Sequence, residues 1–172
     1  MAIKLAKFRD VADGTQAGQF MIGDREAVDS LDAVDPIYKM LMDEPVTATI
    51  AVIGSTGRAN LTPVWFDYEG ATVLLNLATH RKKVDWLRAN PQATFMLMNP
   101  KNAYHWMSIK ATVVREVSED DPEEGPRVIE QLNRVYRKYT GGDTYGLRDP
   151  ARDERRVLFE LKVDSIATFG RP

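Results

Sequence analysis

Four consecutive residues, His80, Arg81, Lys82 and Lys83, concentrate positive charge at one point of the chain. They follow an apolar stretch at 73–78 that is typical of a β-strand, and a short helical pattern begins with them. The first turn of a helix carries unpaired backbone N–H groups and a partial positive charge, so cations there are mildly unfavourable. An anion such as a phosphate, held between the cations and the free N–H groups, would explain this placement. A solvated basic helix start is the alternative.

A second segment, Thr62, Pro63, Val64 and Trp65, carries a proline inside a predicted strand. Proline has no N–H to donate to a sheet, so it belongs at an edge or at a bulge. Backbone groups beside it that the sheet does not use could face a planar heterocycle. The simpler interpretation is an edge proline beside two core aromatics, Trp65 and Phe66.

Hydrophobic patterning and turn residues predict the elements that position these two segments. A short helix is predicted to begin at Pro36, after an Asp35 cap, and further helices are predicted at 81–89 and 122–139. The first three predicted strands are expected to form a meander. Together the elements indicate a mainly β fold with flanking helices, arranged as a small closed or split β-barrel. The six predicted strands are residues 46–53, 59–68, 71–78, 92–98, 104–117 and 156–169.

The composition is that of one ordinary globular domain. The 172 residues suffice for one well-buried domain, and we expect an N-terminal arm at 1–35 followed by a folded domain at 36–172. The net charge of −2 gives no general basic field, which argues against a nucleic-acid partner. No apolar run approaches the roughly 20 residues that cross a bilayer, and no signal peptide is recognised. Cysteine is absent, so we expect a cytoplasmic protein without disulfides or thiolate sites.

The order of these motifs resembles the flavin and deazaflavin split-barrel family, the relatives of pyridoxamine 5′-phosphate oxidase. The resemblance rests on Thr-Pro-Val-Trp-Phe at 62–66, Asp-Tyr-Glu-Gly at 67–70, Asn-Leu-Ala-Thr-His-Arg-Lys-Lys-Val at 76–84 and Leu-Arg-Ala-Asn-Pro at 87–91. It runs in one register from about 35 to 169. The form of the first motif most resembles the branch that uses the deazaflavin coenzyme F420. The resemblance implies a six-stranded split β-barrel, the FMN-binding split barrel.

The resemblance also implies a homodimer with cofactor sites at the subunit interface, where F420, or alternatively FMN, would bind. The implied cofactor-binding residues are Thr62, Pro63, Val64 and Trp65 along the ring, Asn76, Leu77 and Ala78 beneath the ribityl chain, Arg81 and Lys83 at the phosphate with His80 or Lys82 as auxiliaries, and Tyr104 and Trp106 across the dimer.

The histidines and a group of arginines late in the chain are interpreted as structural or solvated residues. The chain has two histidines and no accompanying carboxylate cluster, so no metal site is predicted. His105 alternates with its aromatic neighbours along a strand and therefore lies on the opposite face, where a structural role is favoured. Arg152, Arg155 and Arg156 lie among acids and are interpreted as a solvated loop. The second phosphate site that pyridoxamine-phosphate oxidation needs is therefore not predicted.

The implied activity is that of an oxidoreductase that transfers a hydride between coenzyme F420 and a small conjugated organic substrate. No catalytic acid or base is identified. An FMN-dependent oxidoreductase of the same fold is one alternative. A non-catalytic protein that carries or sequesters a cofactor is another, and the lack of an obvious acid–base pair supports it. The remaining alternative is a structural dimer whose groove is empty.

Overall fold

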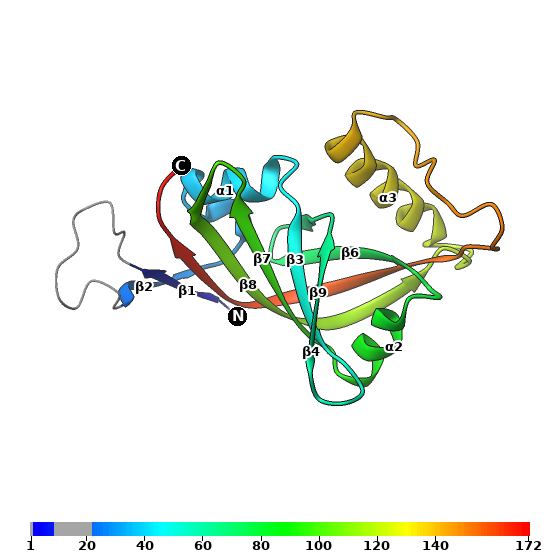
Figure 1. Ribbon diagram of the computed structural model, residues 1–172, viewed down its shortest axis with the longest axis horizontal. Helices are drawn as coiled ribbons and strands as arrows, with labels where there is room; N and C mark the ends of the chain where they lie inside the picture. The colour runs from blue at the N-terminus through cyan, green and yellow to red at the C-terminus, as the bar shows by residue number, and fades with distance from the viewer. Residues whose placement is uncertain (1, 9–21) are drawn as a thin grey trace.

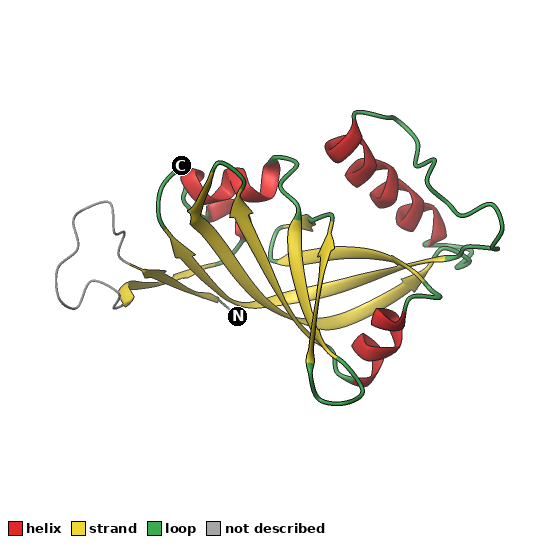
Figure 2. Cartoon of the chain, viewed as in Figure 1, coloured by secondary structure: helices red, strands yellow, loops and turns green. Residues whose placement is uncertain are grey.

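One mixed sheet of nine strands forms the body of the computed structural model, which describes residues 2–8 and 22–172 (Figure 1). The strands are β1 (Ile3–Phe8), β2 (Ile22–Val28), β3 (Ala48–Ile53), β4 (Ala59–Val64), β5 (Asp67–Glu69), β6 (Thr72–Ala78), β7 (Gln92–Asn99), β8 (Asn102–Ser118) and β9 (Arg156–Phe169). The helices are α1 (Pro36–Asp43), α2 (Lys82–Ala89) and α3 (Gly125–Thr140), with a short 3-10 helix at Leu31–Ala33. In Figure 2 the three α-helices lie outside the strands, α1 and α3 on one side of the view and α2 on the other.

The sheet branches at the long strand β9. Residues 156–162 of β9 pair with β6 and residues 165–168 pair with β1, and both partners lie on the edge opposite β8. From β8 the sheet continues through β7 and β3 to its end at β4. The predicted fold class, a mainly β split barrel with flanking helices, is confirmed.

The number of strands differs from the six that were predicted. The predicted strand at 59–68 is two strands, β4 and β5, interrupted at Trp65 and Phe66. Phe66 turns into the core with 1% of its surface exposed, and its N–H donates to the Tyr139 hydroxyl at 3.0 Å instead of to a neighbouring strand. The predicted meander is therefore wrong, because β4 pairs with β3 whereas β5 and β6 form a separate hairpin that joins β9.

The segment expected as an N-terminal arm contributes two further strands. β1 pairs in parallel with β9 and antiparallel with β2. Ile3 and Leu5 of β1 are buried, as are Leu31 and Val34 before α1, and all four belong to the main core. The rest of the expected arm, residues 9–21, lies outside the described residues.

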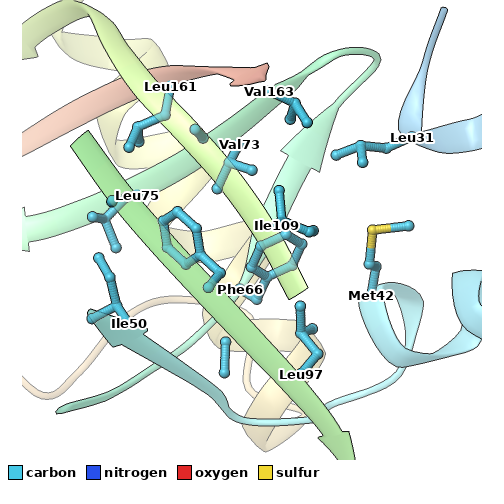
Figure 3. Packing of buried hydrophobic residues seen from close by; sticks show 14 of the residues in the cluster. Leu31, Met42, Ile50, Phe66, Val73, Leu75, Leu97, Ile109, Leu161 and Val163 are labelled. Atoms are coloured by element: carbon cyan, nitrogen blue, oxygen red, sulfur yellow. The ribbon is translucent and has the colours of Figure 1, made fainter. Parts of the chain in front are cut away.

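The core fills the inside of the curved sheet. Ile50, Leu75, Leu97, Ile109 and Leu161 come from β3, β6, β7, β8 and β9, and their side chains converge there (Figure 3). Each is at most 2% exposed, and full burial of such a side chain contributes roughly 1.5–3 kcal/mol. The core thus fixes the relative positions of the strands around the site.

The helices begin and end near the predicted residues. The Asp35 side chain accepts a hydrogen bond from the Ile37 N–H at 3.1 Å and caps α1, as predicted. Helix α3 begins at Gly125, because Asp121 accepts bonds from the N–H groups of residues 123 and 124 and holds them in a preceding turn. It ends at Thr140, and the following Gly141 caps it with a φ of 78° that is unfavourable for other residues. None of the helices in the described ranges has the length and apolar character to cross a membrane.

Helix α3 lies on the outer side of β6 and β9 and forms one wall of the site. Its buried stripe includes Val128, Leu132 and Val135, at the spacing of one helix face. Val128 packs in a small apolar cluster with Leu74 of β6 and Leu158 of β9. This contact holds the N-terminal half of the helix to the sheet.

Candidate functional site

A cavity of about 400 Å³ lies between α3 and the strands β4 and β6. The start of α2, the segment after α3 and the first residue of β9 complete its lining. Such a volume falls within the roughly 300–1,000 Å³ of small-molecule sites. The sequence-predicted residues that line it are Thr62, Pro63, Val64, Trp65, Asn76, Leu77, Ala78, Arg81 and Lys83.

The remaining predicted residues do not line this cavity. His80 and Lys82 are exposed beside it. Tyr104 and Trp106 lie on β8, where Tyr104 is 67% exposed and Trp106 stacks on Phe169 with ring centroids 5.7 Å apart. Their expected role requires a second subunit and stays a prediction.

Two cations mark one end of the cavity. Arg81 stands at the N-cap of α2, and no side chain caps the first turn of that helix. The Lys83 ammonium donates a hydrogen bond to Thr62 Oγ1, which ties α2 to β4. Burial, and next the nearby Arg81 charge, lower the pKa of Lys83 below its usual range. Neither cation forms an ion pair with a carboxylate of the described residues, so both charges are available to an anion.

Aromatic rings hold the C-terminal end of α3 over β4. Trp65 stacks on Tyr139 with centroids 5.3 Å apart and an interplanar angle of 14°. Tyr136 and Tyr145 contact the same indole ring at 6.0 and 6.4 Å. The Tyr145 N–H also donates to Asn133 Oδ1 at 2.9 Å. The apolar side chains on this side of the cavity are therefore fixed in place, which suits a rigid planar ligand.

Arg156 is a site residue that the sequence interpretation missed. It was interpreted as part of a solvated loop, but it is 9% exposed and lines the cavity as the first residue of β9. Its Nη2 lies 2.6 Å from Glu154 Oε1 and donates to the Tyr145 hydroxyl, and its guanidinium lies 4.6 Å from the Tyr145 ring centroid. The interpretation holds for Arg152 and Arg155, which are exposed and paired with Asp149 and with Asp153 and Asp120.

Two amide side chains, from Asn76 on β6 and Gln131 on α3, line the inner wall of the cavity, and Gln131 was also missed. Asn76 Nδ2 on β6 donates to the Val128 carbonyl of α3 at 3.1 Å. Gln131 Nε2 donates to Asp67 Oδ2 at 2.9 Å, and Arg134 holds the same carboxylate at 2.7 Å. A glutamine inside the apolar stripe of α3 is the signal that could have identified Gln131 from the sequence.

The titratable groups of the cavity limit the chemistry of the chain. Among the described residues that line it there is no histidine or carboxylate, and the titratable side chains are Arg81, Lys83, Tyr145 and Arg156. No cluster of metal-ligating residues is found in the described part of the chain. Side chains of these types can bind, orient and donate protons, whereas redox chemistry requires a bound group.

The second histidine of the sequence lies away from the cavity. His105 is fully buried between strand and helix, and its Nδ1 lies 3.1 Å from Asn99 Nδ2. Its ring packs 5.5 Å from that of Tyr38 on α1. Because Tyr104 is exposed, the two residues occupy opposite faces of β8, in agreement with the sequence pattern.

Comparisons with known proteins agree with this geometry. The sequence profile of the pyridoxamine 5′-phosphate oxidase family matches residues 34–170. A search of curated proteins finds no sequence match. Among solved structures, an F420 reductase is similar, with 21% identity and a TM-score of 0.60 over 77% of this chain and 98% of that one.

Two other solved structures share the fold. A conserved hypothetical protein from Mycobacterium tuberculosis is 22% identical, with a TM-score of 0.53 over 75% of this chain and 79% of that one. The heme storage protein HutZ from Vibrio cholerae is 16% identical, with a TM-score of 0.55 over 77% of this chain and 92% of that one. At these identities the likeness concerns the fold alone.

Proposed function

The chain belongs to the pyridoxamine 5′-phosphate oxidase family, and from this premise we propose that it is an oxidoreductase that binds coenzyme F420. It would transfer a hydride between this deazaflavin and a small conjugated organic substrate. The observation that carries the proposal is the single cavity that unites the Thr62–Val64 strand with the cations Arg81 and Lys83. The F420 reductase among the structural neighbours supports the choice of cofactor.

The residues around the cavity fit such a cofactor. Arg81 and Lys83 at the uncapped start of α2 would hold its phosphate. Pro63 and Val64 on one side and Leu132 and Val135 on the other offer apolar surfaces to a planar ring. When bound, the deazaflavin supplies the hydride. The chain orients the ring and excludes water from one face.

Two side chains of the cavity can deliver a proton to the reduced product. Lys83 holds a proton at Nζ, and its lowered pKa makes that proton easier to release than that of an exposed lysine. The Tyr145 hydroxyl oxygen accepts a bond from Arg156, which leaves its own hydrogen free to be donated into the cavity. Loss of activity in Tyr145→Phe or Lys83→Met, measured with each variant saturated with cofactor, would identify the donor.

A homodimer with the cofactor between its subunits is part of the proposal. Large apolar side chains on two strands are exposed in one protomer: Leu61 is 66%, Tyr104 67% and Val114 61% exposed. Burial of such side chains favours association. Sedimentation equilibrium would test the dimer, and a monomer at micromolar concentration would contradict it.

Two alternatives have observations in their favour. FMN could use the same cations and the same strand, because these contacts need only a phosphate and a planar ring. A carrier that binds the cofactor without turnover is favoured by the lack of a histidine or carboxylate among the described lining residues. The heme storage protein among the structural neighbours shows that the fold also serves in storage.

A parallel titration of the apo-protein with F420 and with FMN, followed by fluorescence quenching, tests the proposal. Submicromolar binding of F420 with weak FMN binding supports it, and the reverse preference assigns the protein to FMN. Reduction of conjugated acceptors by the F420-loaded protein then separates an enzyme from a carrier, because a carrier binds the cofactor but does not oxidise it. Binding of neither cofactor overturns the proposal.

A further inference from the structure

A second cavity, of about 370 Å³, lies on the sheet around β1, β8 and β9, with β2 at its edge. The described residues that line it all differ from those that line the cavity between α3, β4 and β6. Strands β1 and β2 supply about half of its lining, and both precede residue 34, where the match to the family profile begins. This β1 cavity is therefore built in large part by a segment that the family match does not include.

The floor of the β1 cavity is a row of small side chains. Ser108 on β8 pairs with Ala167 on β9, which in turn pairs with Ala6 on β1. Residues paired across a sheet share one face, so all three side chains point the same way. They point away from the core, because the adjacent residues Leu5 and Ile109 belong to the core. None of the three side chains extends more than one atom beyond Cβ, which leaves a hollow above the row.

Aromatic rings border this row on one side. Phe8 follows Ala6 by two residues on β1 and lines the cavity. Its ring lies 5.9 Å from that of Trp106 on β8, and Trp106 in turn stacks on Phe169 of β9. The three rings therefore pack on one another across the sheet. They form an apolar border against which an aromatic ligand can pack.

Cations border the row on the other side. Lys110 on β8 and Lys4 on β1 both pair with Ser165 on β9, and all three line the cavity. Neighbouring strands lie about 4.8 Å apart, so the two lysine Cα atoms are roughly 10 Å apart with Ser165 between them. The Ser165 hydroxyl has no hydrogen bond to another described residue and can donate to a ligand.

The positive charges around the β1 cavity are not balanced by the protein. Arg25 on β2 adds a third cation to the lining. Within residues 2–8 and 22–172, no carboxylate pairs with Lys4, Arg25 or Lys110. Glu26 is the one carboxylate among the described lining residues, and Lys7 binds it at 2.9 Å. An anion between the lysines would replace their mutual repulsion with attraction.

We infer that the β1 cavity binds a small organic carboxylate with a compact aromatic body. The ring lies over the row of small side chains, with one edge against Phe8. The carboxylate lies between Lys4 and Lys110, where the Ser165 hydroxyl donates to it. A neutral ligand would leave the cations without a partner, and an inorganic anion would leave the apolar floor uncovered. The inference goes beyond the proposed function and does not depend on it, because these residues do not line the proposed cofactor site.

The first experiment compares three ligands on the unaltered full-length protein by calorimetry. 2-Naphthoate carries both the ring and the charge, 2-naphthamide keeps the shape without the charge, and acetate keeps the charge without the ring. Naphthoate should bind at least about tenfold more tightly than either of the others, the effect of one charge-assisted hydrogen bond or more. Equal binding of naphthoate and naphthamide, or no binding of naphthoate at millimolar concentration, overturns the inference.

The second experiment locates the bound naphthoate with variants. Lys4→Met with Lys110→Met should weaken its binding about tenfold. Lys162→Met is the matched control, because Lys162 is an exposed lysine of β9 that does not line the cavity. Ala6→Leu fills the floor without changing any charge and should weaken binding as well. Thermal melting checks that each variant folds. Unchanged affinity in the folded double lysine variant overturns the inference.

A last comparison separates this site from the proposed cofactor site, which also contains cations. Naphthoate should bind to Arg81→Ala with Lys83→Ala as it binds to the unaltered protein. A loss of affinity in that variant, with none in the variant of Lys4 and Lys110, would assign the carboxylate to the other cavity and overturn the inference. If neither F420 nor FMN binds but naphthoate binding depends on Lys4 and Lys110, the proposed function fails while this inference stands.

Discussion

Two groups of half-buried and buried polar side chains flank α3, and they differ in whether their hydrogen bonds are complete. At its C-terminal end, the Tyr139 hydroxyl donates to the Val46 carbonyl at 2.6 Å and accepts from the Phe66 N–H at 3.0 Å. Lys138 donates to the carbonyls of Phe66, at 3.1 Å, and Met42. These bonds join α3 to the segment between β4 and β5 and to the end of α1.

The other group lies on the cavity side of the same helix and is incomplete. Asn76, Gln131 and Arg156 each use one atom to bind the protein and leave another unpaired. The complete group should therefore determine how stable the fold is, and the cations Arg81 and Lys83 should determine what the fold binds. Variants of the complete group should change stability and leave binding nearly constant, and variants on the cavity side should do the reverse.

The largest expected effect is on binding, in the double variant Arg81→Ala with Lys83→Ala. Affinity for a phosphate-bearing cofactor should fall by about 3 kcal/mol or more, because each charge-assisted bond contributes roughly 1.5–3 kcal/mol. Fluorescence titration with F420 and FMN measures it. Lys82→Ala is the matched control, since Lys82 is exposed beside the cavity and should have little effect. Unchanged affinity of the double variant would contradict the phosphate assignment.

The next effect is on stability, in Tyr139→Phe. This change leaves the Phe66 N–H and the Val46 carbonyl without a partner and should lower the free energy of unfolding by about 2–3 kcal/mol. The ring stacking on Trp65 remains, so cofactor affinity should change less than about twofold. Urea unfolding provides the measurement. Tyr136→Phe, on the same helix turn and against the same indole, should change stability by less than about 0.5 kcal/mol. Similar losses of stability in Tyr139→Phe and Tyr136→Phe would contradict a special role for the Tyr139 hydrogen bonds.

A smaller effect is the pH dependence of binding at Lys83. Since burial and Arg81 lower its pKa, the ammonium loses its proton at a lower pH than an exposed lysine. Cofactor affinity should then fall as the pH rises through this lowered pKa, by about 1.5 kcal/mol at most. Stability of the free protein should change in the opposite direction over the same range, because the charged form is the one that burial disfavours. Lys83→Arg stays charged and should bind with a flat profile. A similar loss of cofactor affinity at alkaline pH in Lys83→Arg would contradict the assignment of this pH dependence to Lys83.

The smallest effect is the alkaline pH dependence of stability at Tyr68, which bonds Asp43 at the end of α1. Burial and a hydrogen bond to Asp43 at 2.8 Å raise the pKa of Tyr68 to about 12. Folding thus favours the protonated phenol, and its contribution to stability should be lost as the pH rises from about 10 to 12. Tyr68→Phe should cost about 1 kcal/mol at neutral pH and show a shallower alkaline decline. Identical alkaline slopes in denaturant titrations of the two proteins would contradict the assignment.

The end of the cavity formed by β6 and α2 could be predicted from the sequence because its signals are local. The apolar run at 73–78, the basic residues after it and the helical pattern that follows are contiguous. Arg81 and Lys83 consequently lie where the sequence placed them, beside Thr62 on the cavity wall. The bounds of β9 were also predicted correctly, since apolar residues recur along its whole length.

The inner wall could not be predicted because distant segments create it. Arg156 looks like one of several arginines in an acidic loop until β9 pairs with β6 and places it opposite Ala78. The break between β4 and β5 has the same origin. Residues 59–68 favour a strand throughout, and the Phe66 N–H leaves the sheet only because Tyr139, on a helix much later in the chain, accepts its hydrogen bond.

The central place of β9 has a consequence for how the chain folds. This strand joins β1, β6 and β8, so the sheet lacks its middle until the chain has been synthesised as far as Phe169. Ile3 and Leu5 on β1 are made first, yet their strand is covered only when the last one arrives. Folding should accordingly be slow, on the millisecond-to-second scale of topologies rich in distant contacts. Until β9 is made, β6 and β8 each have one unpaired edge, so we expect the incomplete chain to be prone to aggregation.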